Sequence, residues 1–288
     1  MRKLYRDGKL ESFKILRSNL CAPTPIAYPE AVKETSHAWT VPELGGLEVM
    51  HASFVRHRFA KHSHETFTVV LIDDGASRFW YHGADHIIGA GMVALLNPDE
   101  VHTGSPITPD GYSQRSLYLG PDHFPEPRFF RELLSRNATL FASISALHDA
   151  IPNRDDLELP VRFSHVTEGL LHLTDARDCR PHRLEPSAVQ QLRERIEDDP
   201  AAQIRLEMLA NSLGSSCAHL SRAFTKMHGL PPHAYRLQVR LERAKPKLLA
   251  GTSAAQVALE LGFNSQSHFT TQFKRWTGVT PGRYRLRV

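Results

Sequence analysis

The stretch "GFNSQSHFTTQFKRWTGVTP", residues 262–281, has the periodicity of an amphipathic helix. Phe269, Phe273 and Trp276 recur at i, i+4 and i+7, so they share one apolar face. The opposite face carries short polar or cationic residues, and Ser265 stands where a helix N-cap is expected. Taken alone, this pattern is typical of any surface helix.

A second copy of the pattern lies upstream, in "LGSSCAHLSRAFTKMHGLPP", residues 213–232. Leu220, Phe224 and Met227 match the aromatic face of the first stretch at a constant offset of 49 residues. A shorter segment with a small residue and a glycine precedes each copy, and glycine followed by proline comes after each. Two crossed helices joined by a glycine-containing turn need such residues, so the chain is predicted to hold two helix-turn-helix units.

The segment between the two copies, "PHAYRLQVRLERAKPKLLAG", has its own helical stripe of apolar residues from Leu237 to Leu248. One helix is therefore expected to join the two units. Pro246 would remove a backbone hydrogen bond from that helix. We expect a kink there rather than an end, because apolar residues continue beyond it.

Four segments carry a resemblance to a known family: "LEMLANSLGSS", "LSRAFTKMHGLPP", "RLERA" and "ALELGFNSQSHFTTQFKRWTGVTPGRYR". Residues 187–288 resemble the tandem helix-turn-helix domain of the AraC/XylS family of bacterial transcription regulators. The resemblance implies sequence-specific binding to double-stranded DNA, with RNA polymerase as a further partner. The chain departs from the family at Arg205, in place of a hydroxyl cap, and at Pro246 and Lys247, where arginine and leucine are usual.

Charge supports a nucleic-acid-binding C-terminal domain. From residue 186 onward, 15 Lys and Arg stand against 7 Asp and Glu, a net charge of +8, whereas the rest of the chain has a net charge of −4. Such an asymmetry is typical of a DNA-binding module joined to another domain.

The resemblance assigns eight residues on the two second helices to reading bases. They are Ala218, Ser221, Arg222, Thr225, Gln266, Ser267, Thr270 and Thr271. Arg222 is the only guanidinium among them, and we expect it to make the main base contact. Basic residues nearby are expected at phosphates: Lys226, Arg236, Arg240, Lys274, Arg275, Arg283 and Arg285.

Length and composition limit the number of domains and the cellular compartments that fit the chain. A chain of 288 residues suggests two domains. Cys21, Cys179 and Cys217 are scattered without metal-ligand spacing, which favours a reduced cytosol. The start lacks a secretory apolar region and no apolar run approaches 18 residues, so we expect a bacterial cytoplasmic protein without a membrane partner.

Residues 45–120 contain strand-like runs separated by Gly, Asp and Pro, which favours an antiparallel sandwich or barrel. The region resembles the cupin-like effector domain found in front of AraC-type regulators, with "HSHETFTVVLIDDG" as the first cupin motif and "GMVALLNPDEVHTG" as the second. The segments 128–135, 137–151 and 161–173 are predicted to be helical.

The predicted fold is therefore α+β in two domains, an N-terminal antiparallel barrel with trailing helices and a C-terminal all-α tandem helix-turn-helix. The expected boundaries are an extension over 1–44, a ligand-binding and dimerisation domain over 45–173, a polar linker over 174–186 and the DNA-binding domain over 187–288.

The cupin resemblance raises an enzyme as the alternative function. His62, His64 and His102 match three metal-binding imidazoles, but Thr68 and Val69 stand where the acidic ligand would lie. We therefore expect no metal or cofactor, although three imidazoles can bind zinc.

Instead, the three histidines are expected to bind a small-molecule effector, together with Tyr118 and an aromatic from the strand "FWY". Strand alternation lets either Trp80, or else Phe79 with Tyr81, face inward, and Trp80 is the predicted ligand contact. A weaker alternative is a front domain that only dimerises.

The last expectation concerns a homodimer. The segments that end near residues 151 and 173 carry apolar stripes (Ile144, Leu147 and Ile151; Val166, Leu170 and Leu173). They look too extensive for lone surface helices, so one of them is predicted to form the interface between two copies.

Overall fold

The computed structural model describes residues 5–6, 9–10, 34–124, 128–152, 158–176 and 186–285. The chain divides into two units, Met1–Ala31 and Val32–Val288. In the first unit, strands β1 (Tyr5–Arg6) and β2 (Lys9–Leu10) pair antiparallel. All that follows concerns the second unit. Cys21 and Cys179 lie outside the described residues, and Cys217 is a free thiol.

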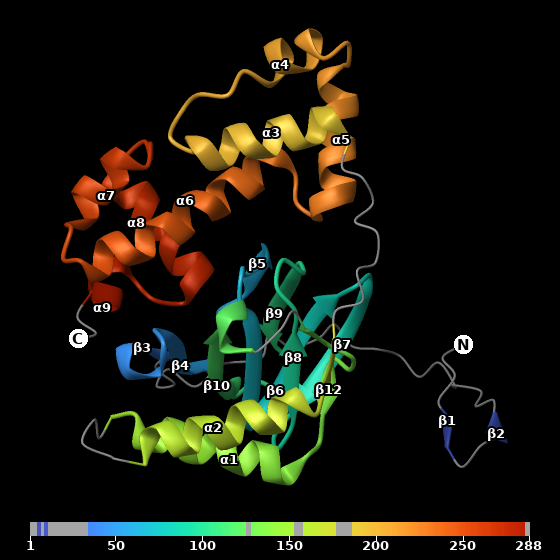
Figure 1. Cartoon of the computed structure of the whole chain (residues 1–288), viewed down its shortest axis with the longest axis vertical. Helices are drawn as coiled ribbons and strands as arrows, with labels where there is room; N and C mark the ends of the chain where they lie inside the picture. Colours follow the sequence, from blue (N-terminus) through green and yellow to red (C-terminus); the bar gives the residue numbers. More distant parts are fainter. Residues whose placement is uncertain are drawn as a thin grey trace, which may run out of the picture. The chain divides into compact units, whose positions relative to one another are not determined.

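The N-terminal part of this unit forms an antiparallel sheet, which confirms the predicted fold class (Figure 1). Nine of the described strands make it up: β3 (Thr35–Val41), β4 (Leu47–Phe54), β5 (Phe59–His62), β6 (Phe67–Tyr81), β7 (Ala84–Gly89), β8 (Val93–Leu96), β9 (His102–Pro106), β10 (Tyr112–Leu119) and β12 (Leu134–Ser135).

Strand β6 links the two halves of this barrel. Its first part pairs with β8 and β10, and its last part pairs with β7 and β9. Gly75 stands at the crossover with φ +72°, and a Cβ there would lie 2.2 Å from the carbonyl oxygen of Gly111. Only glycine allows this close approach, so the long strand can change partners at this point.

Two expected domain boundaries and one predicted helix differ in the structure. Strand β3 pairs with β4, so the barrel begins within the predicted N-terminal extension. The helix predicted over 128–135 is wrong, because this segment forms β11 (Arg128–Phe130) and β12. β11 pairs with β13 (Thr174–Ala176), so the barrel domain extends into the predicted linker, whose residues 177–185 lie outside the described ones. Sheet pairing and burial of Phe130 outweigh the local helical pattern.

Helices α1 (Ala138–Ala150) and α2 (Leu159–Leu171) lie side by side against the sheet (Figure 1). Ile144, Leu147, Val166 and Leu170 are all 0% exposed and belong to one core with the barrel strands. The prediction that one of these stripes forms a dimer interface is therefore wrong. The barrel of the same chain already covers both.

The C-terminal domain is all-α, as predicted. Its described helices are α3 (Ser187–Asp198), α4 (Leu206–Ser212), α5 (Cys217–His228), α6 (Pro232–Leu249), α7 (Ala254–Glu260), α8 (Gln266–Thr277) and α9 (Pro281–Arg285). Pro246 lies inside α6, which continues beyond it to Leu249, so the proline does not end the helix.

The internal repeat is visible in the caps of α5 and α8. Ser216 and Ser265 accept hydrogen bonds from the backbone N–H three residues on. Gly229 and Gly278 end the two helices in the left-handed conformation. Between these caps, Phe224 and Phe273 are each 0% exposed, one in each core of the domain.

Candidate functional site

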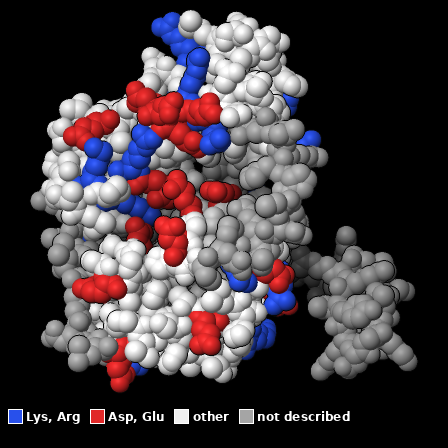
Figure 2. Space-filling model, viewed as in Figure 1, with Lys and Arg blue, Asp and Glu red and all other residues white. Residues whose placement is uncertain are grey.

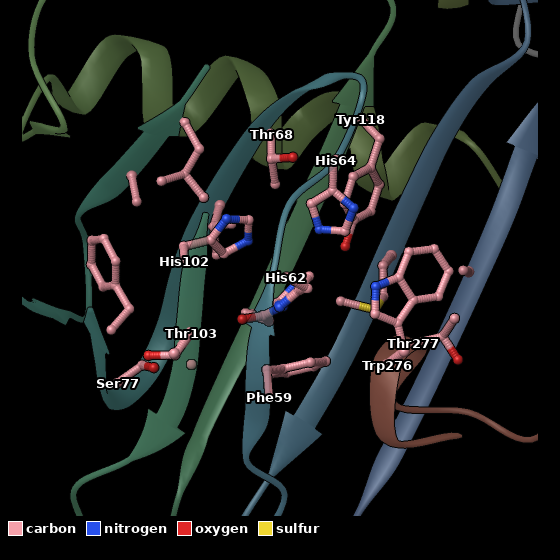
Figure 3. A pocket seen from close by; sticks show the side chains of 18 of the residues that line it. Phe59, His62, His64, Thr68, Ser77, His102, Thr103, Tyr118, Trp276 and Thr277 are labelled. Carbon is pink, nitrogen blue, oxygen red and sulfur yellow. The ribbon is translucent and has the colours of Figure 1, made fainter. Parts of the chain in front are cut away.

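A cavity opens inside the barrel and is lined by strands β3 to β10 together with helices α6, α8 and α9 (Figure 3). It encloses about 910 Å³ of space not filled by atoms, part of it open to solvent. Its walls are mostly apolar, with Met50, Val70, Ile72, Phe79 and Leu96 among them. A largely apolar cavity with a few polar groups is typical of a small-molecule site.

The three predicted histidines converge in this cavity (Figure 3). His62 and His102 are cross-strand neighbours on β5 and β9, and His64 follows two residues after His62. Their rings lie 4.3 to 5.3 Å apart between centroids, and one nitrogen from each lies within 4.8 Å of the others. The structure thus brings together the imidazoles that the two sequence motifs predict.

These imidazoles are neutral at physiological pH. Burial lowers the pKa of His102 to about 4. Burial also lowers the pKa of His62 and His64 well below the ordinary value, and the neighbouring imidazoles lower it further. A buried group avoids a charge that water cannot solvate.

Of the two aromatic residues predicted to contact the effector, Tyr118 lines the cavity and Trp80 does not. Tyr118 lines the cavity with its ring 5.2 Å from that of His64, and burial raises its pKa to about 12. Trp80 is not among the described residues that line this cavity, so the structure does not bring it together with the histidines. Strand alternation turns Phe79 inward instead, while the ammonium of Lys61 lies 4.0 Å from the Trp80 ring centroid.

The DNA-binding domain supplies one wall of the cavity, which sequence reasoning missed. Lys245 comes from α6, Trp276 and Thr277 from α8, and Tyr284 from α9. The Trp276 ring lies 6.1 Å from that of His64. Local periodicity marks these positions only as the buried face of a helix, and it cannot say which domain covers that face.

Polar contacts hold the two domains together beside the cavity. The Ser63 N–H donates to the side-chain oxygen of Gln238 at 2.9 Å, and the Gln238 amide donates to the Ser63 hydroxyl at 3.0 Å. Lys245 forms ion pairs with Glu48 of β4 and Glu242 of α6, at 3.2 Å each. Burial opposes the charge of Lys245, but the two carboxylates raise its pKa well above the ordinary value.

Helices α5 and α8 also lie against the barrel where they end. A Cβ at Gly229, after α5, would lie 2.8 Å from Cγ2 of Val101. A Cβ at Gly278, after α8, would lie 2.9 Å from Cζ of Phe54. The contact of the barrel with the DNA-binding domain therefore includes both helix-turn-helix units.

Two buried polar atoms in the cavity wall have no hydrogen-bond partner among the described residues. They are Nε1 of Trp276, from the DNA-binding domain, and Oγ1 of Thr68, from the barrel. Native proteins rarely leave buried polar groups unpaired, so a bound molecule is a natural partner for both.

The predicted base-reading residues lie on the outward sides of α5 and α8. Ala218, Arg222, Gln266, Ser267 and Thr271 are exposed, and Ser221, Thr225 and Thr270 are half-buried. In the view of Figure 2, Lys and Arg side chains are interspersed with Asp and Glu, so the basic surplus of the domain is not gathered on this face.

The predicted phosphate contacts divide into two groups. Lys226, Lys274, Arg275 and Arg283 are exposed, whereas Arg236 is half-buried and donates to the carbonyl of Ala202. The side chain of Arg285 lies outside the described ones.

Arg240, also predicted at a phosphate, has backbone partners within the protein in this structure. Its guanidinium donates to the carbonyls of Pro200, Ala201 and Gly262, at 2.6 to 3.3 Å, and burial lowers its pKa. Arg240 therefore ties the segment after α3 to the turn after α7.

Comparison with known proteins agrees with this architecture. The family model described as AraC-like ligand binding domain matches residues 44–166, and that described as helix-turn-helix domain matches residues 209–287. The regulator YbfI of Bacillus subtilis, itself described as uncharacterized, is 28% identical over 77% of this chain and 85% of its own. The regulator MtrA of Neisseria gonorrhoeae is 36% identical, over 32% of this chain and 31% of its own.

A solved structure shares the whole two-domain fold. ToxT of Vibrio cholerae O395 superposes with a TM-score of 0.52 over 88% of this chain and 96% of its own, at 14% identity. The chain belongs to the AraC family of transcription regulators, which join an N-terminal ligand-binding domain to a C-terminal helix-turn-helix domain that binds DNA.

Proposed function

We propose that the effector of this regulator binds in the cavity between the barrel and the second helix-turn-helix unit. Trp276 carries the proposal, since its ring lines the cavity while its helix, α8, presents Ser267 and Thr271 to solvent. A molecule in the cavity would touch a DNA-reading helix directly. The effector signal would then pass within one chain, without relying on the segment that joins the domains.

The walls of the cavity indicate the class of effector. Its lining is largely apolar, and the unpaired atoms of Thr68 and Trp276 offer two hydrogen bonds. The indole N–H can only donate, so the effector needs an acceptor oxygen or nitrogen. A small, mostly apolar molecule with an acceptor group fits these requirements.

The charges around the cavity disfavour a simple acid as the direct partner of a side chain. Lys245 is the single Lys or Arg among the described lining residues, and Glu48 and Glu242 already pair with it. A carboxylate would have to displace one of these partners, at the cost of leaving it buried and unpaired.

Trp276→Phe is expected to weaken effector binding about fivefold or more, since a smaller aromatic ring replaces the indole and the hydrogen bond of its N–H, about 1 kcal/mol, is lost. The measurement is a thermal-shift screen of apolar alcohols, ketones, esters and amides, followed by affinities for the best binder. Trp80→Phe is the matched control, because Trp80 lies outside the cavity, and its affinity should be that of the wild type. An unchanged affinity in Trp276→Phe would place the effector elsewhere.

For DNA, we propose that α5 and α8 enter successive major grooves from one side of the duplex. Two recognition helices on one molecule suit groove faces roughly 34 Å apart. Arg222 is the exposed guanidinium on α5, and arginine is the usual reader of guanine. The exposed Lys226, Lys274 and Arg275 support the proposed phosphate contacts.

Arg222→Ala is expected to cost about 1 to 3 kcal/mol of base discrimination and to relax one or two operator positions. Selection from randomised duplexes, with the wild type and the variant, would measure both effects. Lys226→Ala is the control, since loss of a phosphate contact weakens binding to all sequences nearly equally. If the Arg222→Ala variant selects the same consensus as the wild type, Arg222 contacts a DNA phosphate or has a structural role instead of reading a base.

A homodimer, a contact with RNA polymerase and a cytoplasmic location are further proposals, supported by the family alone. The relatives compared are transcription regulators, which favours a regulator over a metal-dependent enzyme. No described helix is long and apolar enough to cross a membrane.

A further inference from the structure

We propose that His62, His64 and His102 bind one Zn²⁺ ion at the polar end of the cavity and leave a fourth coordination position open toward it. The sequence argued against a metal because no acid stands at Thr68 or Val69. Three imidazoles with an open position are, however, a complete zinc ligand set. The proposal goes beyond the effector assignment, because it holds whether or not an organic molecule enters the cavity.

The fold brings the three imidazoles to one place. Pairing of β5 with β9 sets His62 opposite His102. His64 lies in the segment just after β5, and its ring centroid is 4.9 Å from that of His62 and 5.3 Å from that of His102. Their ligand nitrogens lie within 4.8 Å of one another. A tetrahedral zinc ion with bonds of 2.0 to 2.1 Å needs separations of roughly 3.4 Å, which small side-chain rotations reach.

The hydrogen bonds of two rings set the tautomer that a metal needs. Nδ1 of His62 lies 2.8 Å from the carbonyl of Ala60, and Nδ1 of His102 lies 2.9 Å from that of Glu100. A carbonyl only accepts, so each Nδ1 carries the proton and each Nε2 keeps its lone pair free. Metal-binding histidines are held by backbone carbonyls in the same way.

The electrostatic balance favours a cation at this point. The three imidazoles would bind zinc in their neutral form, as histidine ligands do. Beside them, the single charge of Lys245 faces the carboxylates of Glu48 and Glu242, which leaves the group one negative charge in excess. A divalent ion would offset that charge.

The DNA-binding domain also reaches this site. An oxygen of Glu242, on α6, lies 3.9 Å from Nδ1 of His64. A carboxylate beside a ligating imidazole orients the ring and makes it a better ligand. Zinc in the barrel would therefore strengthen the contact with α6, so metal occupancy and domain docking would favour each other.

The test begins with the intact wild-type protein, purified without a histidine tag. Elemental analysis is expected to find about one zinc per chain. After chelation, Co²⁺ should give the visible absorption of a four-coordinate site, and Zn²⁺ should displace it. In the Co²⁺ form, at least two exchange-protected imidazole N–H protons should show paramagnetic NMR shifts, from the Nδ1 atoms of His62 and His102. This measurement needs no variant.

His62→Gln and His102→Gln should each lower Zn²⁺ affinity on the order of 100-fold or more, and Glu242→Gln about 10-fold. His51→Gln, at an exposed position on β4, is the control and should leave the affinity unchanged. Far-UV circular dichroism checks that each variant is folded.

A folded wild-type protein that binds neither Zn²⁺ nor Co²⁺ overturns the proposal, and so does an unchanged affinity in both histidine variants. Metal binding is measured without an organic ligand, so a failed effector screen does not affect this result.

Discussion

Leu170→Glu is expected to unfold the barrel domain rather than to separate two subunits. Leu170 is 0% exposed and packs in the core that α1 and α2 share with the sheet. Truncation of such a leucine alone costs about 3 to 5 kcal/mol, and a carboxylate without a partner costs more. The total approaches or exceeds the stability of a typical domain, about 5 to 15 kcal/mol.

Circular dichroism and thermal unfolding would measure this loss. His165→Glu is the matched control, since it places the same charge on an exposed position of the same helix and should change stability by less than about 0.5 kcal/mol. A Leu170→Glu protein that is folded and monomeric, beside a dimeric wild type, would contradict the packing described here and restore the interface that the apolar stripe suggests.

Phe273→Ala should remove the second helix-turn-helix unit from DNA binding. Phe273 is 0% exposed and contacts Phe269 and Tyr284. Its loss should cost about 3 to 5 kcal/mol, which a core of this size cannot absorb without local melting. Binding to the full operator should fall by 100-fold or more, since about 2.7 kcal/mol corresponds to 100-fold in affinity.

The internal repeat provides an informative comparison for this experiment. Phe224 is the equivalent residue of the first unit and is equally buried, so Phe224→Ala should damage the other half of the operator footprint. Gln272→Ala, beside Phe273 but outside the core, is the control. Footprints on wild-type operator DNA would separate the two halves. If Phe273→Ala protects both half-sites normally, the second unit does not depend on this core.

Local signals in the sequence predicted most of the DNA-binding domain. Helix periodicity located α5 and α8, serines marked their N-caps, and glycines marked where they end. Each of these signals depends on contacts within a few residues, which the sequence records directly. Antiparallel strands in the barrel were found by the same reasoning, because alternation and turn residues are local too.

Features that depend on distant partners were missed or misread. The 128–135 segment has a helical pattern, yet pairing with β13 and β8 makes it strand. The three histidines were found from their motifs, but the sequence could not tell that Trp276 and Lys245 would complete their cavity. A residue that faces another domain has the same local pattern as one that faces its own core, so the choice is made only by tertiary packing.

The glycines after α5 and α8 have a consequence for how the chain can change over evolution. An added Cβ would lie too close to the barrel at each of them, 2.8 Å from Val101 at Gly229 and 2.9 Å from Phe54 at Gly278. A single added methyl group would act as a wedge between the domains, and it would also strain the end of its helix. Two requirements therefore restrict substitution of Gly229 and Gly278. One is the left-handed end of the helix, and the other is the space left by the neighbouring domain. The outward sides of α5 and α8 have no such restriction, so the two repeats can differ there while the ends that rest on the barrel stay alike.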